Sequence, residues 1–246
     1  MSTLQNKLIV ALDVETRDKA LELVEALRGT AGMFKIGSQL FTASGPQLVR
    51  EIVKRDERVF LDLKFHDIPN TVAAAGVEAT RLGVSMFNVH ASGGGTMMRR
   101  TADAVSECAA REGVRRPIVL GVTILTSSDR STLQEIGSHE QPATAVERLA
   151  RLAATNGMDG VVASAHEVAL IRNAISKSPF VIVTPGVRPN NAANDDQNRV
   201  MTPRHAIDAG ADYIVVGRPI LQAHDPVVAA REILAEMERR FAVNGA

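Results

Sequence analysis

Short apolar runs alternate with longer amphipathic segments along the whole chain, and this repeat restricts the possible folds more than any other feature. Eight of the apolar runs have the length of strands and are rich in Val, Ile and Leu. They cover Lys7–Val14, Met33–Ile36, Val59–Phe65, Met86–His90, Ile118–Thr123, Gly160–Ser164, Phe180–Thr184 and Tyr213–Gly217. Eight strand–helix units of about 30 residues each are typical of a (β/α)8 barrel, or TIM barrel. A six-stranded doubly wound sheet is the alternative, but the count of eight and the even spacing favour the barrel.

The segments between the predicted strands have the periodicity of helices that bury one face. The first begins near Thr16, and its apolar residues are Ala20, Leu23, Val24 and Leu27. The last begins at Asp225 with Pro226 in its first turn, where proline suits a helix. Its apolar face holds Val227, Ala230, Leu234, Met237 and Phe241. No linker or change of composition divides the chain, so we expect residues 1–246 to form a single barrel domain with the catalytic site.

The charge balance and the aromatic content argue against nucleic acid and membranes as main partners. The 28 basic residues equal the 28 acidic ones, and aromatic residues make up 3% of the chain. Electrostatic steering toward polyanions and stacking on exposed bases both need what this composition lacks. No stretch reaches the roughly 18 apolar residues of a membrane span, and the first residues do not have the pattern of a signal peptide.

The single cysteine, Cys108, cannot form a disulfide within the chain, which fits a reducing compartment and favours a cytoplasmic location. No neighbouring group is apparent that would lower the pKa of its thiol. We therefore expect Cys108 to pack in a helix rather than to react.

Polar side chains gather where the predicted strands end. They are Asp13, Lys35, Asp62, Lys64, Asp67, His90, Thr123, Thr126, Ser164, Thr184, Arg188 and Arg218. The active sites of barrel enzymes lie at the carboxyl ends of the strands. A barrel core needs none of these groups, and an unpaired buried charge would be costly. The pattern therefore predicts an active site at this end.

The sharpest part of this pattern is the segment DLKFHDIPNT, Asp62 to Thr71. Alternate residues of a strand face the same way, so Asp62 and Lys64 are expected on one side. Lys35 and Asp67 could extend them into an array of alternating charge, which would keep the carboxylates ionised and Lys64 cationic. An ion-pair network that only orients the strands is the structural alternative. Buried ion pairs add little stability, so a function is the better explanation.

The ends of the last two strands predict a phosphate site, because the loops after strands seven and eight bind phosphate in many barrels. Gly186 permits a close approach of the backbone, and the Gly217 N–H can face an anion. Arg218 can hold phosphate with two parallel hydrogen bonds. Gln197 lies in the long loop from Pro185 to about Met201 and could add an amide donor. A second long loop, from Thr126 to about Gln141, is also a candidate binding loop or lid.

At these residues the sequence closely resembles the orotidine 5′-phosphate decarboxylase family of the bacterial type. The matching segments are Ala11–Asp13, Phe34–Gly37, Asp62–Thr71, Asn88–Gly94, Val122–Ser127, Thr184–Pro189, Asp195–Arg199 and Val215–Ile220. They span nearly the whole chain in the order of the family, and the segment Asp62–Thr71 is highly specific. The resemblance implies a barrel that works as a homodimer without metal or organic cofactor. It implies conversion of orotidine 5′-monophosphate to uridine 5′-monophosphate and CO2 in pyrimidine biosynthesis.

The resemblance also implies roles for individual residues. Lys64 would be the proton donor, and the charged network around it would comprise Asp62, Lys35 and Asp67. Asp67 would reach the active site of the other subunit, together with Ile68 and Thr71. The remaining substrate contacts would come from Asp13 and Lys35 to the ribose, Thr126 to the pyrimidine edge, Gln197, Gly217 and Arg218 to the phosphate, and Arg188 in the closing loop.

Loss of CO2 would leave a carbanion at ring carbon 6, which the enzyme must stabilise electrostatically because no cofactor delocalises the charge. Lys64 would be the fixed cation beside it and then the source of its proton. Asp62 would lie near the departing carboxylate. Binding of the remote phosphate could drive loop closure and so contribute to catalysis.

Other functions are compatible with parts of the sequence. The ketogulonate-phosphate decarboxylases share an Asp-x-Lys-x-x-Asp core, which Asp62, Lys64 and Asp67 satisfy, but they need magnesium. The residues that follow Lys64 and the loop with Gln197 favour the nucleotide enzyme. A catalytically silent phosphate-binding barrel would have no use for the costly Lys64. His66 and His90 lie near the same rim, but they lack the spacing of a metal motif, and the Lys64 cation would repel a metal.

Overall fold

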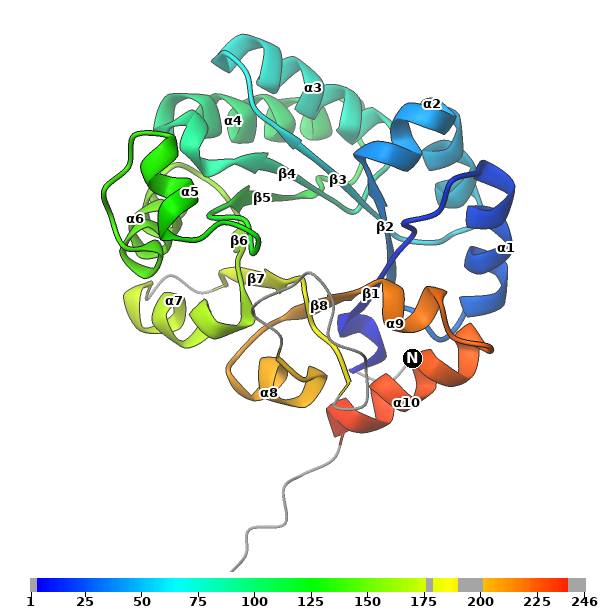
Figure 1. Cartoon of the computed structure of the whole chain (residues 1–246). Coiled ribbons are helices and arrows are strands. Elements are labelled where there is room, and N and C mark those ends of the chain that lie inside the picture. Colours follow the sequence, from blue (N-terminus) through cyan, green and yellow to red (C-terminus); the bar gives the residue numbers. More distant parts are fainter. Residues whose placement is uncertain (1–3, 176–178, 190–200, 239–246) are drawn as a thin grey trace, which may run out of the picture.

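The computed structural model describes residues 4–175, 179–189 and 201–238. Its eight strands are parallel and close into a barrel in the order of the sequence, with β8 pairing with β1. Helices surround the barrel (Figure 1). The predicted (β/α)8 fold is therefore confirmed. The strands are β1 (Leu8–Ala11), β2 (Met33–Gly37), β3 (Val59–Phe65), β4 (Met86–His90), β5 (Ile118–Val122), β6 (Gly160–Val162), β7 (Val181–Thr184) and β8 (Tyr213–Val216).

Helices connect successive strands around the outside. Within the described residues they are α1 (Arg17–Leu27), α2 (Ser38–Lys54), α3 (Pro69–Arg81), α4 (Gly95–Glu112), α5 (Arg130–Glu135), α6 (Pro142–Thr155), α7 (Val168–Ala174), α8 (Pro203–Asp208), α9 (Arg218–Leu221) and α10 (Pro226–Glu238). Three short 3-10 segments, η1 (Gln5–Lys7), η2 (Ala91–Gly93) and η3 (Ala165–Glu167), lie among them. No helix in this part of the chain is long and apolar enough to cross a membrane.

Each strand contributes to two separate apolar cores, because successive side chains point to opposite faces. The side chains that point inward fill the barrel with Ile9, Ala11, Met33, Phe60, Met86, Leu120, Val122, Val162, Val183 and Val215. Those that point outward join a larger core between the strands and the helices. Burial on both faces explains why the strands read as continuous apolar runs rather than as alternating ones.

The outer helices follow the predicted periodicity. Thr16 caps α1 by accepting a hydrogen bond from the Lys19 backbone N–H, and the apolar residues predicted for this helix are buried. In α10, Ala230 and Met237 are buried as predicted, and Phe241 lies outside the described residues. Cys108 is buried in α4, and burial raises the pKa of its thiol, which agrees with a packing role.

The structure corrects several predicted boundaries. β1 ends at Ala11, so Asp13 follows the strand rather than ending it. β6 ends at Val162, and Ser164 instead caps η3 in a capping box with Glu167. The segment predicted as a long loop after Thr126 contains α5, because Asp129 accepts a hydrogen bond from the Thr132 N–H and starts a helix there. The other long loop falls largely on residues 190–200, outside the described residues.

Aspartates fix two strand beginnings on the side of the barrel opposite to the predicted site. Asp212, just before β8, accepts hydrogen bonds from the Ile182 N–H at 2.8 Å and from Arg172 Nη2 at 2.6 Å. Asp159, just before β6, accepts from the Val119 N–H and from Arg116 in the same way.

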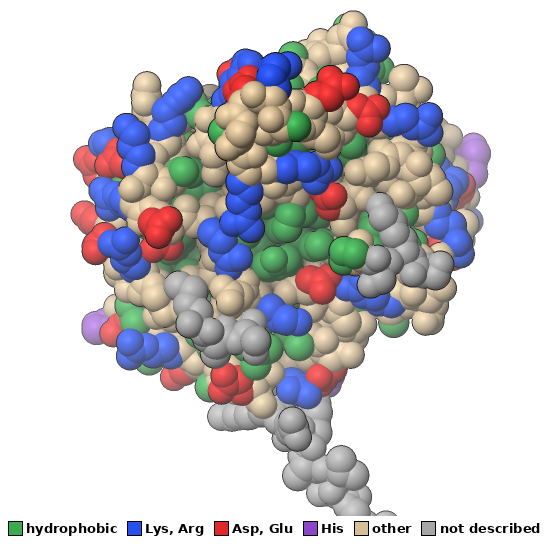
Figure 2. Space-filling view, turned by 180° about the vertical axis from the view of Figure 1, so that it is seen from behind, with side chains coloured by type: hydrophobic (Ala, Val, Ile, Leu, Met, Phe, Trp, Pro, Cys, Tyr) green, Lys and Arg blue, Asp and Glu red, His purple; other side chains and the backbone are tan. Residues whose placement is uncertain are grey.

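Figure 2 shows the molecule from behind, with hydrophobic side chains in a central hollow and charged side chains of both signs around it.

Asp212→Ala should lower the free energy of unfolding by about 1–3 kcal/mol, because a strand amide and a guanidinium lose a charged partner. Asp208→Ala is the matched control, since within the described residues Asp208 forms only an i,i+4 pair with Arg204 on α8. Such a pair is worth about 0.3–0.5 kcal/mol. Urea unfolding of both variants measures the difference. Equal losses would mean that Asp212 acts only as a surface ion pair.

Candidate active site

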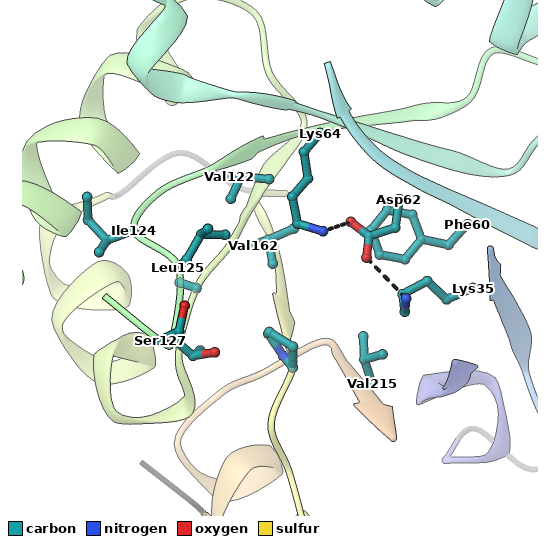
Figure 3. A pocket seen from close by; sticks show the side chains of 13 residues that line it. Lys35, Phe60, Asp62, Lys64, Val122, Ile124, Leu125, Ser127, Val162 and Val215 are labelled. Carbon is teal, nitrogen blue, oxygen red and sulfur yellow. Dashed lines mark hydrogen bonds and ion pairs between the residues drawn. The ribbon is translucent and has the colours of Figure 1, made fainter. Parts of the chain in front are cut away.

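Four charged side chains of alternating sign, Asp13, Lys35, Asp62 and Lys64, line the carboxyl end of the barrel. Figure 3 shows the last three of them. Lys35 Nζ lies 3.1 Å from Asp13 Oδ1 and 3.3 Å from Asp62 Oδ2. Lys64 Nζ lies 2.7 Å from Asp62 Oδ1. Three members of the predicted array, Lys35, Asp62 and Lys64, therefore lie together, with Asp13 rather than Asp67 as the fourth charge, and Asp62 lies between two ammonium groups.

Burial makes this array electrostatically strong. The side chains of Lys35 and Asp62 are only 11% and 12% exposed, whereas that of Lys64 is 34% exposed. Burial alone would lower the pKa of Lys35, but the charges and hydrogen bonds of Asp62 and Asp13 outweigh it and raise the pKa above its ordinary value. Lys35 is therefore a permanent cation at neutral pH, while the more accessible Lys64 faces the cavity.

The end of β3 is irregular where these charges lie. Lys64 has a φ of 52°, a left-handed conformation that is uncommon for a residue with a side chain. The register with β4 changes between Leu61, which pairs with Phe87, and Phe65, which pairs with Val89. Between these two pairs β3 has two more residues than β4. Two is an even number, so side chains before and after the change keep the same alternation of faces. Asp62 and Lys64 thus share the inner side as predicted, on a strand that is bent rather than regular.

Asn88 is a site residue that the sequence reasoning did not single out. It is fully buried in the middle of β4. Its Nδ2 donates to Asp62 Oδ1 at 2.7 Å, and its Oδ1 accepts from the Lys64 backbone N–H at 2.8 Å. The sequence did contain a signal for this residue, which is the lone amide in the apolar run MFNVH. A polar group buried in such a run needs hydrogen-bond partners.

Two cavities open on the array and share Lys35 and Asp62. The first, of about 200 Å³, is mainly apolar, includes Lys64 and Thr126, and is walled by Phe60, Val122, Ile124, Leu125, Val162 and Val215. The second, of about 240 Å³, is lined by Asp13, Gly186, Arg188, Gly217 and Arg218. Apolar and cationic subsites therefore adjoin each other across the charged array.

Most residues predicted to bind substrate lie in one of these cavities. Thr126 is half-buried in the first, and Arg188, Gly217 and Arg218 line the second. Arg188 is buried. Gln197 lies outside the described residues, so its predicted phosphate contact is untested.

Asp67, Ile68 and Thr71 do not reach the array of their own chain. All three are exposed, and Asp67 Oδ1 accepts a hydrogen bond from the Ile68 N–H at 2.6 Å. Ile68, the residue just before α3, is 66% exposed, which is unusual for so large an apolar side chain. Within one chain, Asp67 is therefore not an ion-pair partner of Lys64.

His66 and His90 form a tilted ring pair beside the site, with centroids 5.4 Å apart. Burial, followed by repulsion from His66 and Lys64, lowers the pKa of His90, so its ring is neutral at neutral pH. Among the described residues, no three His, Cys, Asp or Glu side chains are grouped as metal ligands would be.

The chain is similar to known proteins over nearly its whole length. Residues 6–233 match the family described as "Orotidine 5'-phosphate decarboxylase / HUMPS family". The chain is 57% identical to the orotidine 5'-phosphate decarboxylase of Syntrophotalea carbinolica over 233 residues, covering 95% of each chain. It is 52% identical to that of Moorella thermoacetica over 235 residues, covering 95% of this chain and 93% of the relative.

A solved structure gives the same result for the fold. The crystal structure of orotidine 5'-phosphate decarboxylase from Lactobacillus acidophilus superposes with a TM-score of 0.83 at 34% sequence identity. The match covers 94% of this chain and 99% of that one. Sequence and fold thus agree over nearly the full length of both proteins.

Proposed function

The chain belongs to the orotidine 5′-phosphate decarboxylase / HUMPS family, and from this premise we propose that it is a carboxy-lyase that converts orotidine 5′-monophosphate to uridine 5′-monophosphate and CO2. The observation that carries the proposal is the Lys64 ammonium, held by Asp62 at the edge of an apolar cavity that adjoins a cationic one. A pyrimidine nucleotide has a flat ring at one end and a phosphate at the other, and the two cavities suit these ends. A cytoplasmic location, where its single cysteine stays reduced, belongs to the same proposal.

Lys64 would act twice in this reaction. When the bond between ring carbon 6 and the carboxylate breaks, CO2 departs and the electron pair stays on carbon 6. A preorganised cation beside that carbon stabilises the developing charge without reorganisation. Lys64 Nζ then donates a proton to carbon 6 and recovers a proton from solvent. Asp62, near the departing carboxylate, would keep the ammonium group in place and charged.

The ribose and phosphate would bind on the other side of Asp62. Asp13 and Lys35 are the groups suited to ribose hydroxyls, since one accepts hydrogen bonds and the other donates them. Arg218 and the Gly217 N–H would bind phosphate, with Arg188 beside them and Gln197 from the adjoining loop. Thr126 would read an edge of the pyrimidine at the mouth of the apolar cavity.

The charges around Asp62 favour this enzyme over a magnesium-dependent sugar-phosphate decarboxylase. Lys64 and Lys35 each place an ammonium group within 3.3 Å of its oxygens, and the Asn88 amide takes a further position. A divalent cation that bound this carboxylate would have to displace those donors. We therefore propose that the reaction needs neither metal nor organic cofactor.

The decisive experiment is a spectroscopic assay with orotidine 5′-monophosphate in the presence of excess chelator. The proposal expects full decarboxylation by the chelated protein. Activity that disappears with chelator and returns with magnesium would support the metal-dependent class. Binding of the nucleotide without release of CO2 would support a silent binding protein.

Arg218→Ala should weaken the binding of the phosphorylated substrate by about 10- to 100-fold, because a charge-assisted hydrogen bond is worth about 1.5–3 kcal/mol. The corresponding nucleoside, which has no phosphate, should lose little. Comparing kcat/KM for the two substrates in wild type and variant checks this. Equal losses for both would assign Arg218 a structural role.

The active site would be shared between two subunits. Asp67, Ile68 and Thr71 are exposed next to the open end of the barrel and do not contact the array of their own chain. A partner subunit would cover the exposed Ile68 side chain and would receive Asp67 near its own Lys64. In a homodimer with C2 symmetry, each chain gives to its partner what it receives from it.

A further inference from the structure

We infer that Asn88 is a positioning residue for the decarboxylation, because its side-chain amide binds Asp62 and the Lys64 backbone at once and so sets where the Lys64 ammonium lies. The inference rests on the proposed function and adds a residue to its machinery. Asn88 lines neither cavity, so it would act through Asp62 and Lys64 and not on the substrate.

The orientation of the amide is fixed by the chemistry of its partners. The Lys64 backbone N–H can only donate, so the group that faces it at 2.8 Å must be the oxygen of Asn88. An ionised Asp62 can only accept, so the group at 2.7 Å must be the Asn88 NH2. One planar group thus joins the carboxylate to the backbone of the residue that carries the proton donor.

The bent end of β3 explains why a side chain is needed here. The change of register between Leu61 and Phe65 takes the Lys64 amide out of the regular ladder with β4, and the left-handed φ turns it. Asn88, from the facing strand, satisfies that amide. A left-handed conformation in a non-glycine residue is strained and persists only where the surroundings determine it. Asn88 therefore stabilises the conformation that directs Lys64 toward Asp62 and the cavity.

Among side chains of this size that carry no titratable group, only the amide can do both tasks. Leucine has neither donor nor acceptor, and alanine leaves a cavity. Ionised aspartate would face the Lys64 N–H correctly but would place a second carboxylate against Asp62. A protonated aspartic acid, however, has one O–H donor and one carbonyl acceptor, which reproduce the amide. This difference gives Asn88→Asp a pH dependence that a merely structural residue would not show.

The test compares kcat, KM and the Kd of uridine 5′-monophosphate for wild type, Asn88→Ala and Asn88→Asp across pH. Asn88→Ala should lower kcat by about 10²-fold, since a small misplacement of a catalytic group has an effect of that order. The Kd of the product should change less than about threefold. For Asn88→Asp, the ratio of its kcat to that of wild type should rise as pH falls, because one proton is then shared within the carboxylate pair.

Asn156 offers a matched control. It is a buried amide whose oxygen also accepts, from Arg99 Nη2, and whose nitrogen also donates, to the Leu152 carbonyl and to Thr155 Oγ1. It lines neither cavity. Asn156→Asp should leave kcat of the folded protein unchanged, with no added pH dependence.

The outcomes separate the two levels of the proposal. If wild type does not decarboxylate the substrate, the proposed function is wrong. If wild type is active while both Asn88 variants keep kcat within about threefold, or while the kcat ratio of Asn88→Asp does not change with pH, the positioning role is wrong. If Asn88→Ala does not fold, the pH profile of Asn88→Asp decides alone.

Discussion

Lys64→Ala should lower kcat by at least about 10⁴-fold while the protein remains folded. The variant loses a preorganised charge, which alone is worth about 10²–10³-fold, and also the proton donor, which contributes about 10²–10⁴-fold. The fold should tolerate the change because the buried Asp62 keeps Lys35 and Asn88 as partners. Lys64 itself is partly exposed, so its removal leaves no large void.

Three measurements make this prediction specific. Single-turnover assays give the residual rate, thermal unfolding reports the fold, and titration with uridine 5′-monophosphate shows whether the phosphate and ribose contacts survive. Lys54→Ala is the control, since Lys54 is an exposed lysine at the end of α2. A Lys64→Ala protein with a tenth of wild-type kcat would contradict the assignment of Lys64 as proton donor.

A mixture of two inactive variants should regain about a quarter of wild-type activity if the active site is shared. In a mixed dimer of Lys64→Ala and Asp67→Ala, one site receives both changes and the other receives an intact Lys64 and an intact Asp67. Random exchange at equal amounts makes half of the dimers mixed, and each of these has one good site of two. The expected recovery follows from these two factors of one half.

The readout is kcat per subunit after exchange, with native mass spectrometry of differently tagged chains to show that mixed dimers form. Asp67→Asn in place of Asp67→Ala is a second variant that keeps the size of the side chain while removing its charge. If Asp67 acted within its own chain, every site would keep one defect. Mixed dimers without recovered activity would therefore refute the shared site.

The two predictions are connected by the geometry of one segment. Lys64 ends the inner row of β3, whereas Asp67 lies three residues later and projects from the rim. A shared site would make catalysis depend on assembly, so dilution below the dimer dissociation constant should reduce activity per subunit. Lys64 would keep its ion pair with Asp62 throughout, because that contact lies within one chain.

The sequence by itself determined the fold and three of the four members of the array, namely Lys35, Asp62 and Lys64. The eight apolar runs were sufficient to predict the barrel, because parallel strands that are buried on both faces are apolar at successive positions rather than at alternate ones. The positions of Asp62 and Lys64 followed from the two-residue period of a strand, which the structure preserves even across the change of register. Strand ends were less certain, as Asp13 and Ser164 show, because the last residues of a strand depend on pairing with neighbours that are distant in sequence.

Tertiary structure alone decided which charges meet and what holds them. Lys35 reaches both Asp13 and Asp62 because β1, β2 and β3 are adjacent in the closed barrel, and the sequence contains no distances between strands. Asn88 came to light only when β4 was placed beside β3, because a hydrogen bond between side chains 26 residues apart leaves no periodic pattern. Asp67 illustrates the opposite case: its proximity to Lys64 in sequence suggested contact, but the turn into α3 directs it away, since backbone direction and not sequence distance determines where a side chain lies.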